Sequence, residues 1–124
     1  MTVLDLTTPN PLEEDDLFEM ANLYPRETGL PMTVWVSNRG RARHDVRVKV
    51  CRIRGNRMDT DETAVVGVRP EPRLIEGPLA PSDLKLVVEW IKLNEATIIG
   101  YWDGSIDTGG LIRGLKPMPR ADYP

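Results

Sequence analysis

Positively charged side chains that could bind phosphate groups are concentrated in one stretch of the chain. Residues 39–57 contain eight of the sixteen basic residues and a single acidic residue, Asp45. The eight are Arg39, Arg41, Arg43, Arg47, Lys49, Arg52, Arg54 and Arg57. A β-hairpin that presents such side chains could bind the phosphates of DNA. The stretch holds no Phe, Tyr or Trp on which a base could stack, so a single-stranded or RNA ligand is less favoured.

An acidic protein surface is the alternative partner of these arginines. Residues 1–25 contain six acids and no base. The arginines would then form the solvated outer face of a sheet and pair with an acidic helix at residues 13–19, of the same chain or of a neighbour. The net charge of −3 does not by itself indicate nucleic acid as the partner of the whole molecule.

The single histidine and the single cysteine lack the neighbours that catalysis requires. His44 could act as a base oriented by Asp45, or by Asp103 or Asp107 far along the chain. Adjacent residues of a strand point to opposite faces, however, so His44 and Asp45 do not naturally form a catalytic pair. Cys51 lies between basic residues that could lower a thiol pKa, although a lone strand cysteine is more often a small buried hydrophobe. We therefore predict that the chain is not an enzyme.

Two further segments superficially resemble ligand sites. Residues 103–107 suggest a calcium loop, but the required glycine spacing and terminal glutamate are missing. The pair Gly109-Gly110 is too short to cradle a phosphate. The sequence thus predicts neither a metal site nor a cofactor.

The length and composition predict one small domain. A chain of 124 residues with 40% hydrophobic residues can bury a single modest core. We expect a flexible leader at residues 1–9, one domain at residues 10–116 and a tail at residues 117–124. The acidic amino terminus, the lone cysteine and the lack of a long apolar run predict a soluble, cytoplasmic protein without a membrane segment.

Local patterns predict an α+β fold with a three- or four-stranded antiparallel sheet. Asn10, Pro11 and Glu13 are typical of a helix start, so a short helix is expected through about Leu23. Period-two alternation predicts strands at residues 32–37, 45–50 and 63–69, with a break in phase at Cys51 that indicates a bulge or the end of regular pairing. Residues 74–79 are expected as an extended connection, and residues 111–115 as a possible last strand.

Residues 81–104 carry the clearest helix signals in the chain. Ser82 is a good cap, Gly104 is a stop signal, and Asn94 predicts an end or bend that divides the segment into two helices. The apolar arc sweeps roughly 220° of the helical wheel, which is more than one sheet face covers. We expect the surplus side, which includes Leu86, Trp90 and Leu93, to contact a second layer or a second subunit.

Parts of the sequence resemble a small bacterial family of unknown function. The resemblance rests on the segment Ile75-Glu76-Gly77-Pro78-Leu79-Ala80-Pro81 with the helix that follows, on Trp102, and on Trp35-Val36-Ser37-Asn38. The family reads as a strand, a Pro-Pro-His-Phe-His signature, two more strands, and a Leu-Glu-Gly-x-Leu-Pro helix that ends in tryptophan. Its first histidine falls on His44, but Arg43, Asp45 and Val46 replace three signature residues. The resemblance implies a divergent member that lacks the signature.

Together these patterns favour a binding or structural module. Members of the family that the chain resembles are often encoded beside small partners in toxin–antitoxin-like pairs, so the resemblance implies a small protein partner. The apolar arc predicts a homodimer through Leu86, Trp90 and Leu93. The alternative is a DNA-binding module that uses the hairpin at residues 39–57, with Arg39, Arg41, Arg43, Arg47, Lys49, Arg52 and Arg54 as its contacts.

Overall fold

The computed structural model describes residues 20–57 and 59–119. Its strands are β2 (Met20–Leu23), β3 (Met32–Ser37), β4 (Arg47–Arg54), β5 (Thr63–Gly67) and β6 (Arg73–Glu76). Its helices are α1 (Pro25–Thr28), α2 (Pro81–Asp103) and α3 (Thr108–Gly114). This element order is that of an α+β fold, as the sequence predicts.

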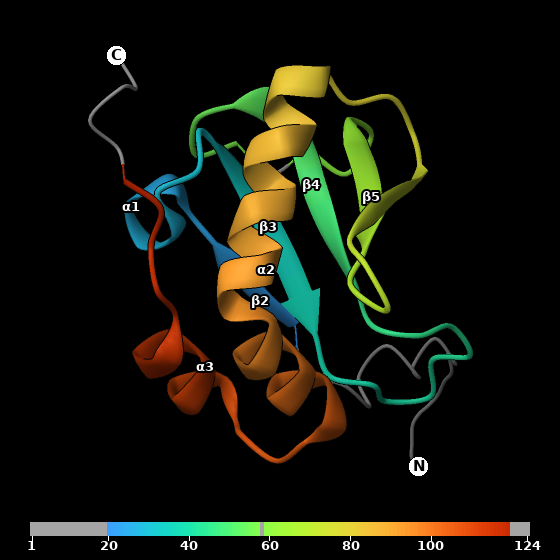
Figure 1. The fold of residues 1–124 in the computed structure, drawn as a ribbon, viewed down its shortest axis with the longest axis vertical. Coiled ribbons are helices and arrows are strands. Elements are labelled where there is room, and N and C mark those ends of the chain that lie inside the picture. The colour runs from blue at the N-terminus through green and yellow to red at the C-terminus, as the bar shows by residue number, and fades with distance from the viewer. Residues whose placement is uncertain (1–19, 58, 120–124) are drawn as a thin grey trace, which may run out of the picture.

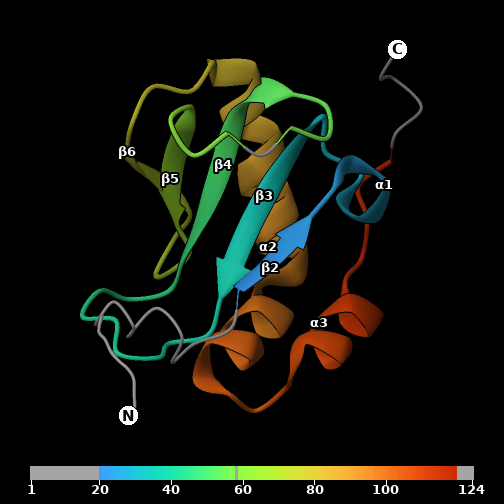
Figure 2. The same ribbon diagram turned by 180° about the vertical axis from the view of Figure 1, so that it is seen from behind.

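The five described strands form one antiparallel sheet in which each strand pairs with the next along the chain. The long helix α2 crosses one face of the sheet (Figure 1). The view from behind shows the opposite face with none of the three described helices over it (Figure 2). The sheet therefore has a core face and a second face on which other side chains are presented.

Valines on alternate positions of the three central strands form the core face. Val34, Val48 and Val66 are fully buried and pack with Trp90 and Ile91 of α2. The register places Val34 opposite Val50, and a shift between Met32 and Val34 leaves extra β4 residues opposite this end of β3. The phase break predicted at Cys51 is thereby confirmed as a register irregularity.

The predicted amino-terminal helix is wrong over its last four residues. Residues 20–23 form the edge strand β2, in which Ala21 and Leu23 are buried and Met20 and Asn22 are exposed. Alternation over only four residues is compatible with either a helix or a strand. Pairing with β3 favours the strand because it provides hydrogen-bond partners for the backbone N–H and C=O groups. Residues 10–19 of the predicted helix lie outside the described residues.

The predictions for β6 and α3 also need correction. Residues 74–76 of the expected connection belong to the strand β6, which pairs with β5. Residues 111–115, expected as a possible strand, belong largely to α3 because the Asp107 carboxylate accepts from the Gly110 N–H (2.8 Å) and caps the helix. Leu111 is buried against the core through helical rather than strand geometry.

The helix α2 bends where the sequence predicts. Asn94 has φ −117° and ψ 18°, which divides α2 into two helical segments, and Gly104 ends it in the left-handed conformation. Pro81 rather than Ser82 begins the helix. The side of α2 that was expected to need a second layer includes Trp90, which is 0% exposed, and Leu93, which is 42% exposed. The large Trp90 side chain on this side is therefore covered within the chain, whereas Leu93 is not.

The carboxy-terminal segment supplies part of that cover by docking on α2 and α1. The side-chain amide of Asn94 donates to Lys116 O (3.0 Å) and its carbonyl accepts from Lys116 N–H (2.7 Å). Met118 N–H donates to Thr28 O (2.7 Å), and Met118 packs against the core. Residues 117–119, expected as part of a tail, are thus in contact with the domain.

Replacing Asn94 with alanine should lower the free energy of unfolding by about 2 kcal/mol, since it leaves the Lys116 backbone groups without partners in a part-buried position. Urea denaturation followed by tryptophan fluorescence measures this change. Asn56→Ala, at an exposed turn position, is the control and should stay within about 0.5 kcal/mol of the wild type. Equal effects of the two substitutions would show that the Asn94–Lys116 clamp does not stabilise the fold.

Candidate functional site

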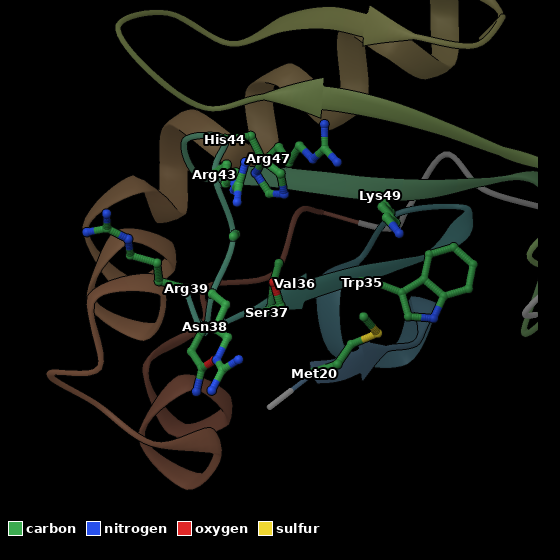
Figure 3. A pocket seen from close by; sticks show the side chains of 12 residues that line it. Met20, Trp35, Val36, Ser37, Asn38, Arg39, Arg43, His44, Arg47 and Lys49 are labelled. Carbon is green, nitrogen blue, oxygen red and sulfur yellow. The ribbon is translucent and has the colours of Figure 1, made fainter. Parts of the chain in front are cut away.

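A hollow of about 460 Å³ lies beside the β3–β4 connection, on the side of the sheet that carries Trp35 and Lys49 (Figure 3). A volume of this size is typical of ligand sites. Its lining comprises Met20, Trp35, Val36, Ser37, Asn38, Arg39, Arg41, Ala42, Arg43, His44, Arg47 and Lys49. These residues come from the start of β2, the end of β3, the connecting loop and the first half of β4.

Strand pairing fixes the side chains that enter the hollow from the sheet. Trp35 of β3 stands opposite Lys49 of β4, between strand positions whose valines face α2. Because successive strand residues point to opposite faces, Trp35, Arg47 and Lys49 share the face away from α2. Figure 3 shows Arg43, His44 and Arg47 together and Lys49 between this group and Trp35, while the Arg39 side chain extends away from them.

The β3–β4 loop, residues 38–46, is held at the carboxy-terminal end of α2. Arg39 N–H donates to Trp102 O (2.8 Å), and the His44 ring lies on the Trp102 ring with centroids 5.6 Å apart. A tight turn at Gly40, with φ +51°, is closed by the bond from Ala42 N–H to Arg39 O (2.8 Å). These contacts fix the backbone from which three of the arginines extend.

The basic residues of the sequence-predicted set divide into two groups. Arg39, Arg41, Arg43, Arg47 and Lys49 line the hollow, and none of them forms an ion pair with any residue of the described ranges.

The other three are paired with nearby carboxylates. Arg52 bonds Glu62, Arg54 bonds the buried Asp83 (2.8 Å), and Arg57 lies 3.8 Å from Asp59. Arg52 and Arg54 do not line the hollow, and each already has a carboxylate partner.

The one acidic residue of the basic stretch is neutralised by a more distant arginine. Asp45 accepts from Arg69 Nε and Nη2 (both 2.9 Å), at the end of the loop. The hydrogen bond from Arg69 lowers the pKa of Asp45 below its ordinary value of 3.8, and a backbone hydrogen bond from Val46 lowers it further. Asp45 thus does not cancel the charge of the cations that line the hollow.

The substitution Arg69→Gln should raise the pKa of Asp45 toward 3.8, since the larger cause of the lowering is removed. A pH titration of the Asp45 carboxyl by NMR measures the shift. Because the folded-state pKa lies below the unfolded value, the pair stabilises the fold above about pH 4 and this contribution is lost as the pH falls further. An unchanged pKa in Arg69→Gln would contradict this assignment.

A second, smaller hollow of about 130 Å³ adjoins the first. It shares Met20, Trp35 and Lys49 with the larger hollow and adds Thr60 and Thr63. The two hollows together extend along the face of the sheet from the β3–β4 loop to the β4–β5 turn.

The candidate catalytic residues do not form a reactive group. His44 is exposed, and its Nδ1 donates to the Asp45 carbonyl oxygen (2.8 Å) rather than to a carboxylate. Cys51 is a free, fully buried thiol in β4. Within residues 20–57 and 59–119, no three His, Cys, Asp or Glu side chains are arranged to hold a metal ion.

The predicted partner interface is not assembled as one exposed patch. Trp90 lies in the core, Leu86 is half-buried and Leu93 is exposed. The wide apolar arc that suggested this interface is used mainly for packing within the chain, since both the sheet and the carboxy-terminal segment contact α2.

Sequence reasoning missed the two apolar residues that line both hollows. Trp35 is only 6% exposed, so it forms a wall of the hollow without presenting an open ring face, whereas Met20 is 47% exposed. Because side chains alternate along β3, the Trp35 side chain projects from the face of the sheet opposite to Val34 and Val36. That signal could have identified Trp35, but the position of Met20 depends on the β2–β3 pairing.

Comparisons with known proteins gave no family model, curated protein or solved structure that matches this chain. The resemblance to the bacterial family therefore stays a prediction. None of the described helices is both long and apolar enough to cross a membrane.

Proposed function

We propose that the protein binds nucleic acid, with duplex DNA as the favoured form, by holding backbone phosphates in the basic hollow. The observation that carries this proposal is that five cations without carboxylate partners among the described residues line one hollow. Arginine and lysine are the residues that contact phosphate oxygens most often. A shared concave site lets several of them act on one polyanion.

The proposal favours phosphate contacts over base stacking. Trp35 is the one Trp, Tyr or Phe of the lining and is almost fully buried, so it offers no ring face on which an unpaired base could stack. Binding through phosphates alone is sequence-independent and depends strongly on salt. The expected activity is therefore duplex binding with little sequence preference.

The sequence favours protein–protein contacts over DNA binding. The geometry gives more support to DNA binding. Burial of Trp90 removes the centre of the apolar patch on which the homodimer prediction depends. The homodimer, a small protein partner and a location in the cytoplasm are kept as predictions within this proposal. They concern how the protein works in the cell, not how the hollow binds phosphates.

Fluorescence anisotropy of a labelled 20-base-pair duplex of mixed sequence tests the proposal. We expect binding at 50 mM salt that weakens steeply, with a slope of log K against log salt of about −4.5 if the five cations each contact a phosphate. An unrelated duplex should bind with similar affinity. Absence of binding at low salt, or a slope near zero, would overturn the proposal.

A further inference from the structure

The part of the sequence that comes before Met20, a residue lining the basic hollow, is strongly acidic. Met20, the first described residue, lines both hollows, and residues 1–19 come directly before it. These nineteen residues contain six acids and no base, including the run Glu13-Glu14-Asp15-Asp16. A strongly acidic segment thus directly precedes, in the sequence, a residue that lines the candidate site.

The length of chain between the acidic run and the hollow permits direct contact. Asp16 and Glu13 lie four and seven residues before Met20. A connection of this length spans about 13 to 25 Å when extended, at 3.3–3.6 Å per residue. Cations such as Arg47 and Lys49 line the same hollow as Met20, so they are within this reach.

We propose that the acidic segment at residues 13–16 occupies the basic hollow in the free protein and competes with nucleic acid for it. Carboxylates and phosphates are recognised by the same donors of arginine and lysine, so the segment acts as an internal mimic of the polyanion. Its tethering gives it a high effective concentration at the hollow. The competition rests on the proposed function, whereas occupancy of the hollow by the segment does not.

The strength of the competition sets the affinity for DNA. If the hollow is open in only a fraction of the molecules, the apparent dissociation constant rises by the inverse of that fraction. Removing the acidic charges should therefore tighten DNA binding even though no residue of the hollow changes. The cations that become available are the same five that line the larger hollow.

A charge-matched pair of full-length variants separates this competition from a general charge effect. One variant carries Glu13→Gln, Glu14→Gln, Asp15→Asn and Asp16→Asn. The control carries Glu71→Gln, Glu76→Gln, Glu89→Gln and Glu95→Gln, four glutamates that form no ion pair within the described ranges and do not line the hollow. We expect the first variant to bind the duplex about tenfold or more tightly, and the control to gain less than about threefold.

Zero-length carbodiimide cross-linking of the wild-type protein tests occupancy without any nucleic acid. The reagent joins a lysine amine to a carboxylate that touches it, and the chain has four lysines, Lys49, Lys85, Lys92 and Lys116, all exposed. Mass spectrometry should find the segment at residues 13–16 joined to Lys49 in preference to the other three. Added duplex or high salt should remove this cross-link.

The outcomes are distinguishable. A lack of preference for Lys49 overturns occupancy, and equal affinity gains in the two variants overturn competition. A Lys49 cross-link in a protein that binds no duplex supports occupancy of the hollow by the segment and overturns the proposed function instead.

Discussion

Replacing Arg41, Arg43 and Arg47 together with glutamine should weaken binding of the labelled duplex about 100-fold or more at 50 mM salt, because three phosphate contacts are lost from the hollow. Glutamine keeps much of the length and polarity of the side chain and removes its charge. The slope of log K against log salt should become less steep by about 3, which anisotropy measures over a salt series.

The control for this triple variant removes the same charge elsewhere. Arg73, Lys85 and Lys92 are exposed, lie outside the hollow and form no ion pair within the described residues. Their replacement with glutamine should change the affinity less than about threefold, since only the long-range field is altered. If both triple variants weaken binding equally, the hollow is not the site of phosphate contact.

The second large effect is expected on stability. Replacing Gly29 with alanine should lower the free energy of unfolding by about 4 kcal/mol, for two reasons that act together. Gly29 ends α1 with φ +77°, which disfavours any residue with a Cβ. In addition, a Cβ here would lie 2.0 Å from Met118 O, so the carboxy-terminal segment would have to move and its bond to Thr28 would be lost.

Gly104→Ala separates these two reasons. Gly104 has nearly the same conformation, with φ +83°, but a Cβ added there would have no neighbour within 4 Å. This substitution should cost about 1 kcal/mol, the conformational part alone. Urea unfolding followed by tryptophan fluorescence compares the two variants. If Gly29→Ala costs no more than Gly104→Ala, the close approach of Met118 does not constrain the fold.

The central sheet and the long helix could be predicted because local signals there agree with tertiary packing. The valines of β3, β4 and β5 alternate clearly, and each set meets α2 in the core. Asn94 marked the bend of α2 because an asparagine within an apolar arc is a poor helix-interior residue. Its pairing with Lys116, 22 residues away, left no local signal.

The short elements at residues 20–23 and 111–115 were mispredicted because so few residues do not distinguish the helical period from the strand period. Residues 20–23 fit a helix or a strand, and only the partner strand β3 decides. Residues 111–115 read as a strand until Asp107 is recognised as the cap of α3. Such contacts are set by the whole fold.

The cluster of basic residues was visible in the sequence, but which of them have carboxylate partners was not. Sequence alone treats Arg52 and Arg54 like Arg43 and Arg47. The structure separates them because Glu62 and Asp83, distant in the chain, pair with the first two. Which cations remain available to a ligand is therefore a property of tertiary structure.

NMR of the ¹⁵N-labelled protein, titrated with the unlabelled duplex, tests most directly whether the hollow binds nucleic acid. The largest amide shifts should fall on the loop at residues 38–46 and on Arg47 and Lys49, while amides near Lys85 and Lys92 of α2 stay unchanged. Shifts centred on α2, or binding that leaves the loop and β4 unperturbed, would contradict it.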